Sequence, residues 1–504
     1  MAAGKSVLLV TVDCLRADHC GFMGYSRPTT PFLDNLAGQS FVFPTAIVAG
    51  APTYYSFPAI MASRYPFGLG REMIGLAAGE MNLASAFKLA GYSTAFFGAA
   101  NPYLSARFGY DHGFDTFRDS LDGNLTPLSN SDHASANQGN WAGSLNRSLD
   151  KISHRLGPLG AAYDELYFQY CQRWTTKPPK SLDALRRFPA ADVIVDQART
   201  WLASLGENPF FLWLHFMDPH SPYYPTEKGL EILGEKNVTP LRVRYLNAYW
   251  NRSDLGSKRL LRRRENVMAF YDAGICWVDA QVSRLISALR QFNLWENCIL
   301  ALTADHGEEF LEHDGRYHAP FSLVEQLIHV PLLLRVPGAA KKDLPAAPFS
   351  LLHLAPTLLD AAALPIPAEF SGDSHWQDIQ EGRMESGFAI AECIASCTNP
   401  FRPELRRGPR LLAVRGARHK LVLSFETGTA SMFDLKSDPE ERKPLSQKAA
   451  KPERRQMLQI ALEHLKKQSG RRHSTAYLRT RIREIKLSLA AGEPRSNRNR
   501  AAAP

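Results

Sequence analysis

The sequence predicts an α/β fold in which helices cover both faces of a mostly parallel sheet. Short, continuous apolar runs of strand length alternate with segments of helical periodicity along most of the chain. Strands buried on both faces read as such runs, and their alternation with helices is typical of parallel sheets. The 504 residues are 45% hydrophobic and 22% charged, the balance of a globular protein with a large core.

The first half of the chain supplies three expected strands and three expected helices. Pro31 lies at an early position of the first helix, and Asn82 is a suitable N-cap for the second, which Gly91 ends. The expected strands are Ser6–Val12, Tyr92–Phe97 and Phe210–Phe216, and the expected helices are Thr30–Gly38, Asn82–Ala90 and Asp192–Leu205.

The second half continues this alternation and then changes character. A long amphipathic helix is expected over Val267–Phe292, followed by strands at Cys298–Thr303 and Val330–Val336. Shorter strands follow, which predict a small antiparallel sheet; they are Phe388–Glu392, Leu411–Arg415, His419–Ser424 and Ser431–Asp434.

Three regions are therefore expected along the chain. Residues 1–380 form the α/β domain, 381–445 a small antiparallel subdomain, and 446–504 a basic tail that is helical and partly disordered. Residues 120–180 begin rich in Ser, Asn, Gly and Asp and end rich in aromatic residues. We interpret them as an insertion that folds over the site, although a spacer fits the composition equally well.

Composition also excludes some classes of protein and points to a compartment. The longest apolar runs are of strand length, far below the roughly 20 residues that cross a bilayer, so a multi-span membrane protein is excluded. No secretory signal is visible, and the seven cysteines are scattered without zinc-finger spacing. Reduced thiols in the cytoplasm are the expectation.

The positive charge is concentrated in the tail. Residues 441–504 contain 17 Lys/Arg and 5 Asp/Glu, a net charge of +12, whereas residues 1–440 contain 42 and 45, a net charge of −3. A solvated helix with a disordered end explains this composition. Binding to nucleic acid or to an anionic membrane surface is the alternative, although no nucleic-acid-binding motif accompanies the charge.

Three aspartates follow apolar strands and are expected to meet. Asp13, Asp218 and Asp305 come at or just after the ends of three expected strands. In parallel sheets the ligand site lies beyond the carboxyl ends of the strands, so these carboxylates should converge on one edge. A carboxylate buried at a strand tip needs a cation or a network of donors. A helix cap or a turn is the alternative role for each.

The neighbouring residues suggest which chemistry this edge supports. His306 follows Asp305, and ligation by oxygen and nitrogen suits Zn²⁺ or Mn²⁺ better than Ca²⁺. Thr53 and Ser56 both offer a hydroxyl that a metal would activate as a nucleophile, although either would also serve as a helix N-cap.

Histidines near the third strand add further candidates. His215 and His220 flank Asp218, and His220 is placed to bind a substrate oxygen or to protonate a leaving group. Asp218 and His220 would alternatively hold a second metal. His318 is a candidate ligand or anion contact, although a single histidine is more often an ordinary surface or core residue.

Together these segments resemble the sulfatase branch of the alkaline phosphatase superfamily, in the family's order over roughly residues 5–445. The matching segments are Asp13-Cys14-Leu15-Arg16-Ala17-Asp18-His19, Gly24-Tyr25, Thr30–Ala37, Gly113-Phe114-Asp115, Asp218–Pro222, Asp305-His306-Gly307-Glu308, His329-Val330-Pro331-Leu332, Pro337-Gly338, Ala355–Asp360, Val414-Arg415, His419-Lys420-Leu421, Phe433-Asp434-Leu435 and Asp438-Pro439-Glu440. The resemblance implies an alkaline-phosphatase-like fold and hydrolysis of an ester.

The sequence departs from this family at three positions. Sulfatases carry a Cys or Ser that is matured to formylglycine, and counting back from Ser63-Arg64 places Thr53 there, which cannot be matured in this way. Cys14 stands where many sulfatases have a second aspartate ligand, and Asn101 where they usually have a lysine. The departures favour a phosphodiester or phosphonoester substrate and a Thr nucleophile. A sulfatase, a phosphotransferase and a non-catalytic scaffold are the alternatives.

The resemblance implies roles for the candidate residues. Asp13, Asp305 and His306 bind one divalent metal, Zn²⁺ or Mn²⁺ rather than Ca²⁺ or Mg²⁺, and Thr53 attacks phosphorus to form a covalent ester. His220 contacts the phosphoryl group or protonates the leaving oxygen. The residues proposed for a second metal or for substrate contact are Asp218, His318, Asn101 and His215. The expected substrate is an ester of a small molecule, a glycan or a lipid head group, and no oligomeric state is predicted.

Overall fold

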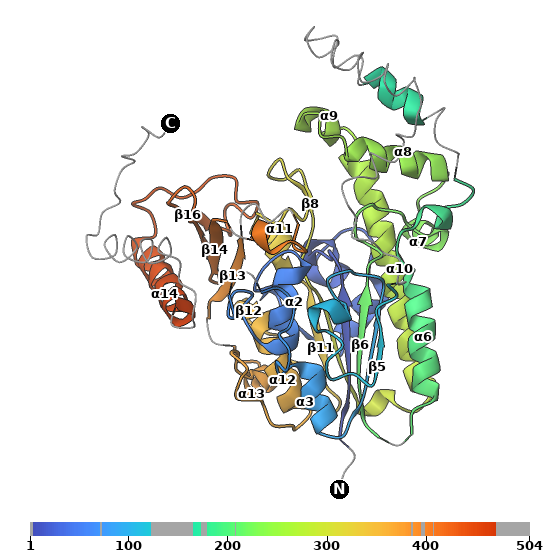
Figure 1. Cartoon of the computed structure of the whole chain (residues 1–504), viewed down its shortest axis with the longest axis vertical. Helices are drawn as coiled ribbons and strands as arrows, with labels where there is room; N and C mark the ends of the chain where they lie inside the picture. Colours follow the sequence, from blue (N-terminus) through green and yellow to red (C-terminus); the bar gives the residue numbers. More distant parts are fainter. Residues whose placement is uncertain are drawn as a thin grey trace.

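The computed structural model describes residues 4–469, except for 71–72, 122–164, 173–178, 207, 385–386, 395–398 and 407. Figure 1 shows a large α/β body with a smaller sheet and helix α14 beside it. The predicted fold class is confirmed. Among the described residues, none of the helices combines the length and apolar character that crossing a bilayer requires.

A seven-stranded sheet forms the centre of the α/β body, in the order β2-β11-β7-β1-β6-β4-β5. Strands β7, β1, β6, β4 and β5 run parallel, and β11 and β2 complete one edge with antiparallel pairings. The bounds of the strands are β1 Ser6–Val12, β2 Phe41–Val42, β4 Ser93–Gly98, β5 Thr116–Arg118, β6 Phe210–Phe216, β7 Cys298–Ala304 and β11 Leu332–Arg335.

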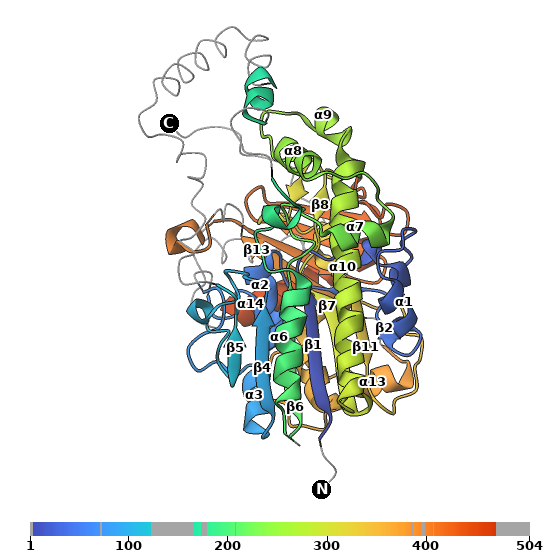
Figure 2. The same cartoon turned by 90° about the vertical axis from the view of Figure 1, so that its right-hand side faces the viewer.

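Helices cover both faces of this sheet, as the alternation of segments predicts. Helices α6 (Ala191–Ala203) and α10 (Arg264–Gln291) lie on one face (Figures 1 and 2). Helices α2 (Thr53–Ala62), α3 (Leu83–Leu89) and α12 (Leu354–Ala361) lie on the other. Asn82 caps α3 by accepting a hydrogen bond from the backbone N–H of Ser85, which confirms its predicted role.

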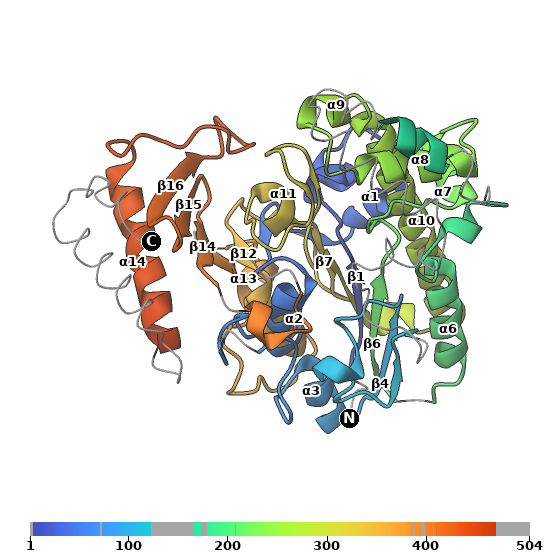
Figure 3. The ribbon, with the colours of Figure 1, turned by 45° about the horizontal axis from the view of Figure 1, so that its top comes forward.

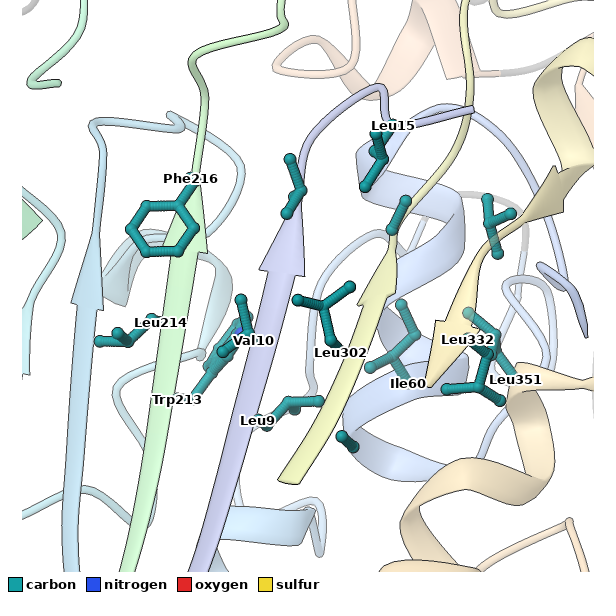
Figure 4. Packing of buried hydrophobic residues seen from close by; sticks show 14 of the residues in the cluster. Leu9, Val10, Leu15, Ile60, Trp213, Leu214, Phe216, Leu302, Leu332 and Leu351 are labelled. Atoms are coloured by element: carbon teal, nitrogen blue, oxygen red, sulfur yellow. The ribbon is translucent and has the colours of Figure 1, made fainter. Parts of the chain in front are cut away.

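The core sits between the sheet and these helices. Every residue of β1, β6 and β7 is buried, which explains the continuous apolar runs in their sequences. Figure 4 shows Val10 of β1 between Trp213 of β6 and Leu302 of β7. Burying one such large apolar side chain contributes about 1.5–3 kcal/mol, so this central layer holds the strand ends rigidly.

Smaller elements surround the body. The three-stranded sheet β10-β3-β12 and the hairpin β8-β9 lie outside the main sheet. Their bounds are β3 Ala46–Ile47, β8 Glu309–Phe310, β9 Arg316–Tyr317, β10 His329–Val330 and β12 Phe349–Ser350. The remaining helices of the body are α1 Pro31–Ala37, α7 Glu227–Leu233, α8 Pro240–Trp250, α9 Ser257–Leu261, α11 Glu325–Ile328 and α13 Trp376–Glu381.

The predicted antiparallel subdomain is present, and part of the basic tail belongs to it. Sheet β13-β14-β15-β16 is entirely antiparallel, with bounds Ala389–Ile394, Arg410–Arg415, His419–Ser424 and Thr429–Asp434. Helix α14 (Lys451–Ser469) packs on it, with Met457 and Leu465 in one cluster with Leu412 and Val414 (Figure 3). This stretch of the tail is therefore an amphipathic helix with a buried face.

Two predicted segments lie wholly or largely outside the described residues. The tail beyond residue 469 is not described, nor are residues 122–164 and 173–178 of the predicted insertion. Its helical residues 165–172 pack against α8, where the ring of Phe168 lies 5.5 Å from that of Tyr245. Coverage of the site by the insertion stays a prediction.

Candidate active site

The carboxyl ends of two adjacent parallel strands bring the predicted metal ligands together. Val12 of β1 pairs with Ala304 of β7, so Asp13 and Asp305 follow at the same edge of the sheet. Both aspartates and His306 are fully buried, and one ligand atom of each lies within 4.8 Å of the others. The rule that strand ends of a parallel sheet meet thus predicts this cluster correctly.

Thr53, the first residue of α2, also belongs to this cluster. Its Oγ1 donates a hydrogen bond to Oδ2 of Asp305 at 2.8 Å and lies 3.2 Å from Nε2 of His306. Ser56 lies one turn later, and its hydroxyl donates instead to the backbone carbonyl of Thr53 at 3.2 Å. Of the two hydroxyls, Thr53 is the one that faces the cluster, and the N-terminus of α2 favours negative charge there.

Asn101 and His215 hold the carboxylate of Asp13. The side-chain amide of Asn101 donates to Oδ2 of Asp13 at 2.8 Å, and Nε2 of His215 lies 3.4 Å from the same oxygen. Nδ1 of His215 lies 2.9 Å from the hydroxyl of Thr11, which fixes the ring. These two predicted candidates therefore contact Asp13, one of the candidate metal ligands.

Two further residues enter the site without a role assigned from the sequence. The Cys14 thiol donates to Oδ1 of Asp13 at 3.0 Å and lies 3.4 Å from Nδ1 of His318. Glu308 is fully buried, and its Oε1 lies 3.1 Å from the same nitrogen. Both residues are adjacent to predicted ligands in sequence, but adjacency alone does not say where a side chain points.

His220 and His318 form the outer rim of the cluster. Their ring centroids are 4.8 Å apart, and the His318 ring lies 4.7 Å from that of His306. The His318 side chain is 21% exposed, whereas those of Asp13 and His306 are fully buried. A substrate that approaches from solvent therefore meets the two rim histidines first.

Asp218 lies outside the candidate metal-ligand groups of the described residues and pairs with Arg186, so its role as a second-metal ligand stays a prediction. Its fully buried side chain accepts a hydrogen bond from Arg186 at 2.6 Å, and the backbone N–H of Ala191 donates to the same oxygen at 3.3 Å. Asp218 belongs to none of the candidate metal-ligand groups among the described residues. The aspartate does reach the strand edge, where its Oδ1 pairs with a buried guanidinium, while its Oδ2 has no hydrogen-bond partner among the described residues. Burial outweighs the charge of Arg186 and raises the pKa of Asp218.

The electrostatics of the cluster reflect two buried carboxylates in contact with histidines. Burial, followed by the charge of Asp13, raises the pKa of Asp305 to about 8. Burial also opposes ionisation of Asp13. The charges of His220 and His306 and the hydrogen bond from His215 outweigh this effect of burial and hold the pKa of Asp13 well below its usual range. Burial, with the charge of His318, lowers the pKa of His306 to about 4.

The rim histidines differ from each other. Burial lowers the pKa of His220. For His318 burial acts in the same direction, but the negative charge of Glu308 and its hydrogen bond outweigh it and raise the pKa to about 9. His318 therefore binds a proton more readily than His220 does.

The donor set fits a divalent cation. Two carboxylates, a hydroxyl and an imidazole converge at one buried point, and burying paired carboxylates without a cation is costly. Nδ1 of His306 lies 2.9 Å from the carbonyl oxygen of Gly307, to which it can only donate. This contact leaves the lone pair of Nε2 for a metal, a common arrangement around ligating histidines.

Comparison with known proteins agrees with this geometry. The family model described as Sulfatase matches residues 5–364, which is more than half of the chain. The chain belongs to the sulfatase family. A second model, described as N-sulphoglucosamine sulphohydrolase, C-terminal, matches residues 313–468 and so extends over the antiparallel sheet and most of α14.

Several curated relatives are arylsulfatases. Arylsulfatase K of Canis lupus familiaris is 28% identical over 284 residues, which are 49% of this chain and 50% of the relative. An arylsulfatase of Clostridium perfringens is 24% identical over 473 residues, 86% of this chain and 89% of the relative. The chain thus spans half the length of the dog relative and 38% of arylsulfatase K of Gallus gallus.

Solved structures share the fold at low sequence identity. A phosphonate monoester hydrolase of Agrobacterium radiobacter superposes with a TM-score of 0.62 at 18% identity, covering 93% of this chain and 96% of that protein. A protein in complex with its substrate D-glucosamine-2-N,6-O-disulfate superposes with a TM-score of 0.66 at 16% identity, covering 93% and 99%. These matches support the alkaline-phosphatase-like fold that the motifs imply.

Proposed function

We propose that this chain is a metal-dependent hydrolase of sulfate esters in which Thr53 is the nucleophile. The observation that carries the proposal is the placement of the Thr53 hydroxyl, 2.8 Å from Asp305 and 3.2 Å from His306, within a buried ligand cluster. Membership of the sulfatase family and several arylsulfatase relatives favour sulfate over the phosphoester that the sequence departures suggest.

The residues have complementary roles in this proposal. Asp13, Asp305 and His306 would hold the metal, and the bound cation would lower the pKa of the Thr53 hydroxyl. Asn101 and His215 orient Asp13 through the contacts at 2.8 and 3.4 Å.

The reaction needs two displacements at the sulfur, with the Thr53 oxygen as the nucleophile of the first and the leaving group of the second. Oγ1 of Thr53 loses its proton and attacks the sulfur, the ester oxygen leaves, and a sulfate ester of Thr53 forms. Threonine has one oxygen on Cβ, so water must then attack the sulfur to release sulfate and restore Thr53. His220 and His318 face the incoming anion, and we propose that they contact the ester oxygens and supply the proton for the leaving group.

A phosphonate or phosphate ester is the second candidate substrate. The specific observation in its favour is the unmodified hydroxyl of Thr53 at the nucleophile position, because a metal-bound alkoxide suits phosphoryl transfer. The structural neighbour from Agrobacterium radiobacter is a phosphonate monoester hydrolase, although at 18% identity it shows the shared fold alone. Zn²⁺ or Mn²⁺ is proposed for the metal because the donors include imidazole.

A substrate panel with the Thr53→Ala variant tests the proposal. The metal-loaded full chain is assayed on 4-nitrophenyl sulfate, 4-nitrophenyl phosphate and 4-nitrophenyl phenylphosphonate, and quenched samples are analysed by accurate-mass spectrometry. We expect fastest turnover of the sulfate ester and a sulfo adduct on Thr53, both lost in Thr53→Ala. A phospho adduct with faster phosphonate turnover would establish the second candidate instead. Turnover that survives in Thr53→Ala would overturn the assigned nucleophile.

A further inference from the structure

Cys14 lies beside the ligand cluster, and the proposed function gives its thiol no role. Among the described residues, three groups of side chains are placed so that they could hold a metal ion, and Cys14 belongs to two of them. One group combines Cys14 with His306 and His318, and the other combines it with Asp13 and His220. In each group the ligand atoms lie within 4.8 Å of one another, so the thiol connects Asp13 with all three histidines.

The backbone of Cys14 adopts an energetically unfavourable conformation that positions the thiol. The φ angle of Cys14 is +61°, in the left-handed region that favours glycine, and a non-glycine residue there costs about 1 kcal/mol or more. Hydrogen bonds hold the backbone in this conformation. The Tyr271 hydroxyl donates to the Cys14 carbonyl at 2.7 Å, and the backbone N–H of Cys14 donates to Oδ1 of Asp305 at 3.4 Å. The turn thereby directs Sγ towards Asp13 and His318.

Glu308 provides a second, independent indication of a cation at this point. Its side chain is fully buried, and one carboxylate oxygen contacts His318 at 3.1 Å. The other oxygen, Oε2, has no hydrogen-bond partner among the described residues. An ionisable oxygen buried without a partner is costly, and a carboxylate that orients a histidine is a typical neighbour of metal ligands.

We propose that Cys14 is a thiolate ligand of the metal at this centre, which makes the centre selective for Zn²⁺ over Ca²⁺. The inference rests on the proposed metal site but not on the substrate or on Thr53. On binding, the Sγ–H bond breaks, an Sγ–metal bond forms and one proton leaves to solvent. Thiolate sulfur binds Zn²⁺ strongly, whereas Ca²⁺ and Mg²⁺ prefer oxygen. Asp13 and His306 supply the neighbouring carboxylate and imidazole, and His318 stays at the rim with its ring held by Glu308.

Cobalt substitution tests the proposal by absorption rather than by activity. The full chain is stripped with a chelator, loaded with one equivalent of Co²⁺, and its near-ultraviolet and visible spectra are recorded. A thiolate ligand gives a sulfur-to-cobalt charge-transfer band, while visible d–d bands report bound cobalt whatever its ligands are. We expect both sets of bands in the wild type and only the d–d bands in Cys14→Ser. The matched control is Cys20→Ser, because Cys20 is equally buried, its thiol donates to the backbone carbonyl of Arg16 at 3.5 Å, and it belongs to none of the candidate metal-ligand groups among the described residues.

Metal competition and a variant-free measurement complete the test. In Cys14→Ser and Cys14→Asp we expect Zn²⁺ affinity to fall about 10-fold or more, while Ca²⁺ affinity stays unchanged or rises in Cys14→Asp. The ¹¹³Cd NMR shift of the cadmium-loaded wild type reports a sulfur ligand even if the variants misfold. Bound cobalt without a charge-transfer band would overturn the proposal and leave the proposed function intact. Failure to bind cobalt at all would overturn both the proposal and the metal part of that function.

Discussion

Thr53 Oγ1 donates a hydrogen bond to Asp305 Oδ2 at 2.8 Å, although 252 residues separate them in the chain. Thr53 begins helix α2, which lies on one face of the main sheet. Asp305 directly follows strand β7, at the carboxyl ends of the parallel strands of that sheet. The contact places the Thr53 hydroxyl within the buried cluster of candidate ligands, whereas the hydroxyl of the nearby Ser56 donates to a backbone carbonyl.

Substitution of Thr53 should abolish activity, whereas substitution of Ser56 should leave it largely unchanged. We expect Thr53→Ala to lower turnover of the best ester substrate by about 10⁴-fold or more, because the nucleophile is lost. Ser56→Ala removes only a hydrogen bond within α2, so activity should be retained with a stability loss of about 1 kcal/mol. Steady-state kinetics and urea unfolding of both variants measure this. An inactive Ser56→Ala beside an active Thr53→Ala would reverse the assignment.

Removal of the Asn101 side chain should weaken metal binding while preserving the fold. Asn101 donates to Asp13 at 2.8 Å, and loss of such a supporting contact typically lowers metal affinity about 10–100-fold. Competition with a chromophoric chelator gives the affinity of Asn101→Ala. The matched control is Asn82→Ala, which removes the N-cap of α3 at a cost of about 1 kcal/mol and should leave metal affinity unchanged. Equal metal affinity in both variants would show that Asn101 does not support the site.

Asp218 should prove to be a structural residue. The side chains of Asp218 and Arg186 are 0% and 10% exposed, and removing one partner of a buried pair costs about 3–5 kcal/mol. We therefore expect Asp218→Asn to lower the free energy of unfolding by a few kcal/mol, near the lower end of that range because the amide still accepts from Arg186. Metal content, measured by mass spectrometry with inductively coupled plasma, should stay at the wild-type stoichiometry. Loss of metal without loss of stability would instead identify Asp218 as a ligand.

His464 should make the C-terminal subdomain less stable in acid. Its Nε2 lies 3.2 Å from Glu392 on β13, and burial, with the charges of Arg410 and Lys467, holds the pKa of His464 well below its usual value. The unfolded chain binds a proton here below about pH 6.5, whereas the folded chain does not. Stability from this group is therefore complete above about pH 6.5 and falls as the pH drops towards the folded pKa.

The His464→Gln variant isolates this effect. Glutamine keeps a donor for Glu392 but does not titrate, so the difference in unfolding free energy between wild type and variant should change between pH 7.5 and 5.5. The slope attributable to one such group approaches about 1.4 kcal/mol per pH unit. Urea unfolding at both pH values measures it, and a difference that stays constant would show that the folded and unfolded states do not differ in the pKa of His464.

The sequence by itself determined the fold class, the order of the segments and which residues form the candidate ligand cluster. Apolar runs such as Ser6–Val12 are buried on both faces, so a continuous apolar run in the sequence indicates a central strand of the sheet. Because the strands are parallel, residues directly after them must share an edge, and this rule located Asp13 and Asp305 without any coordinates. His306, adjacent to Asp305, reaches the same cluster.

Only the tertiary structure decided where side chains at that edge point. The Asp13 side chain points into the candidate ligand cluster, where Asn101 contacts it, whereas the Asp218 side chain points towards Arg186. Both aspartates nevertheless follow buried strands of one sheet. The partner that draws Asp218 away comes from a segment 32 residues earlier, and no local pattern encodes that approach. The direction of the Cys14 thiol likewise depends on a backbone held by Tyr271, 257 residues away. Sequence periodicity specifies which residues reach an edge, but contacts between distant segments determine their orientation, and orientation decides the chemistry.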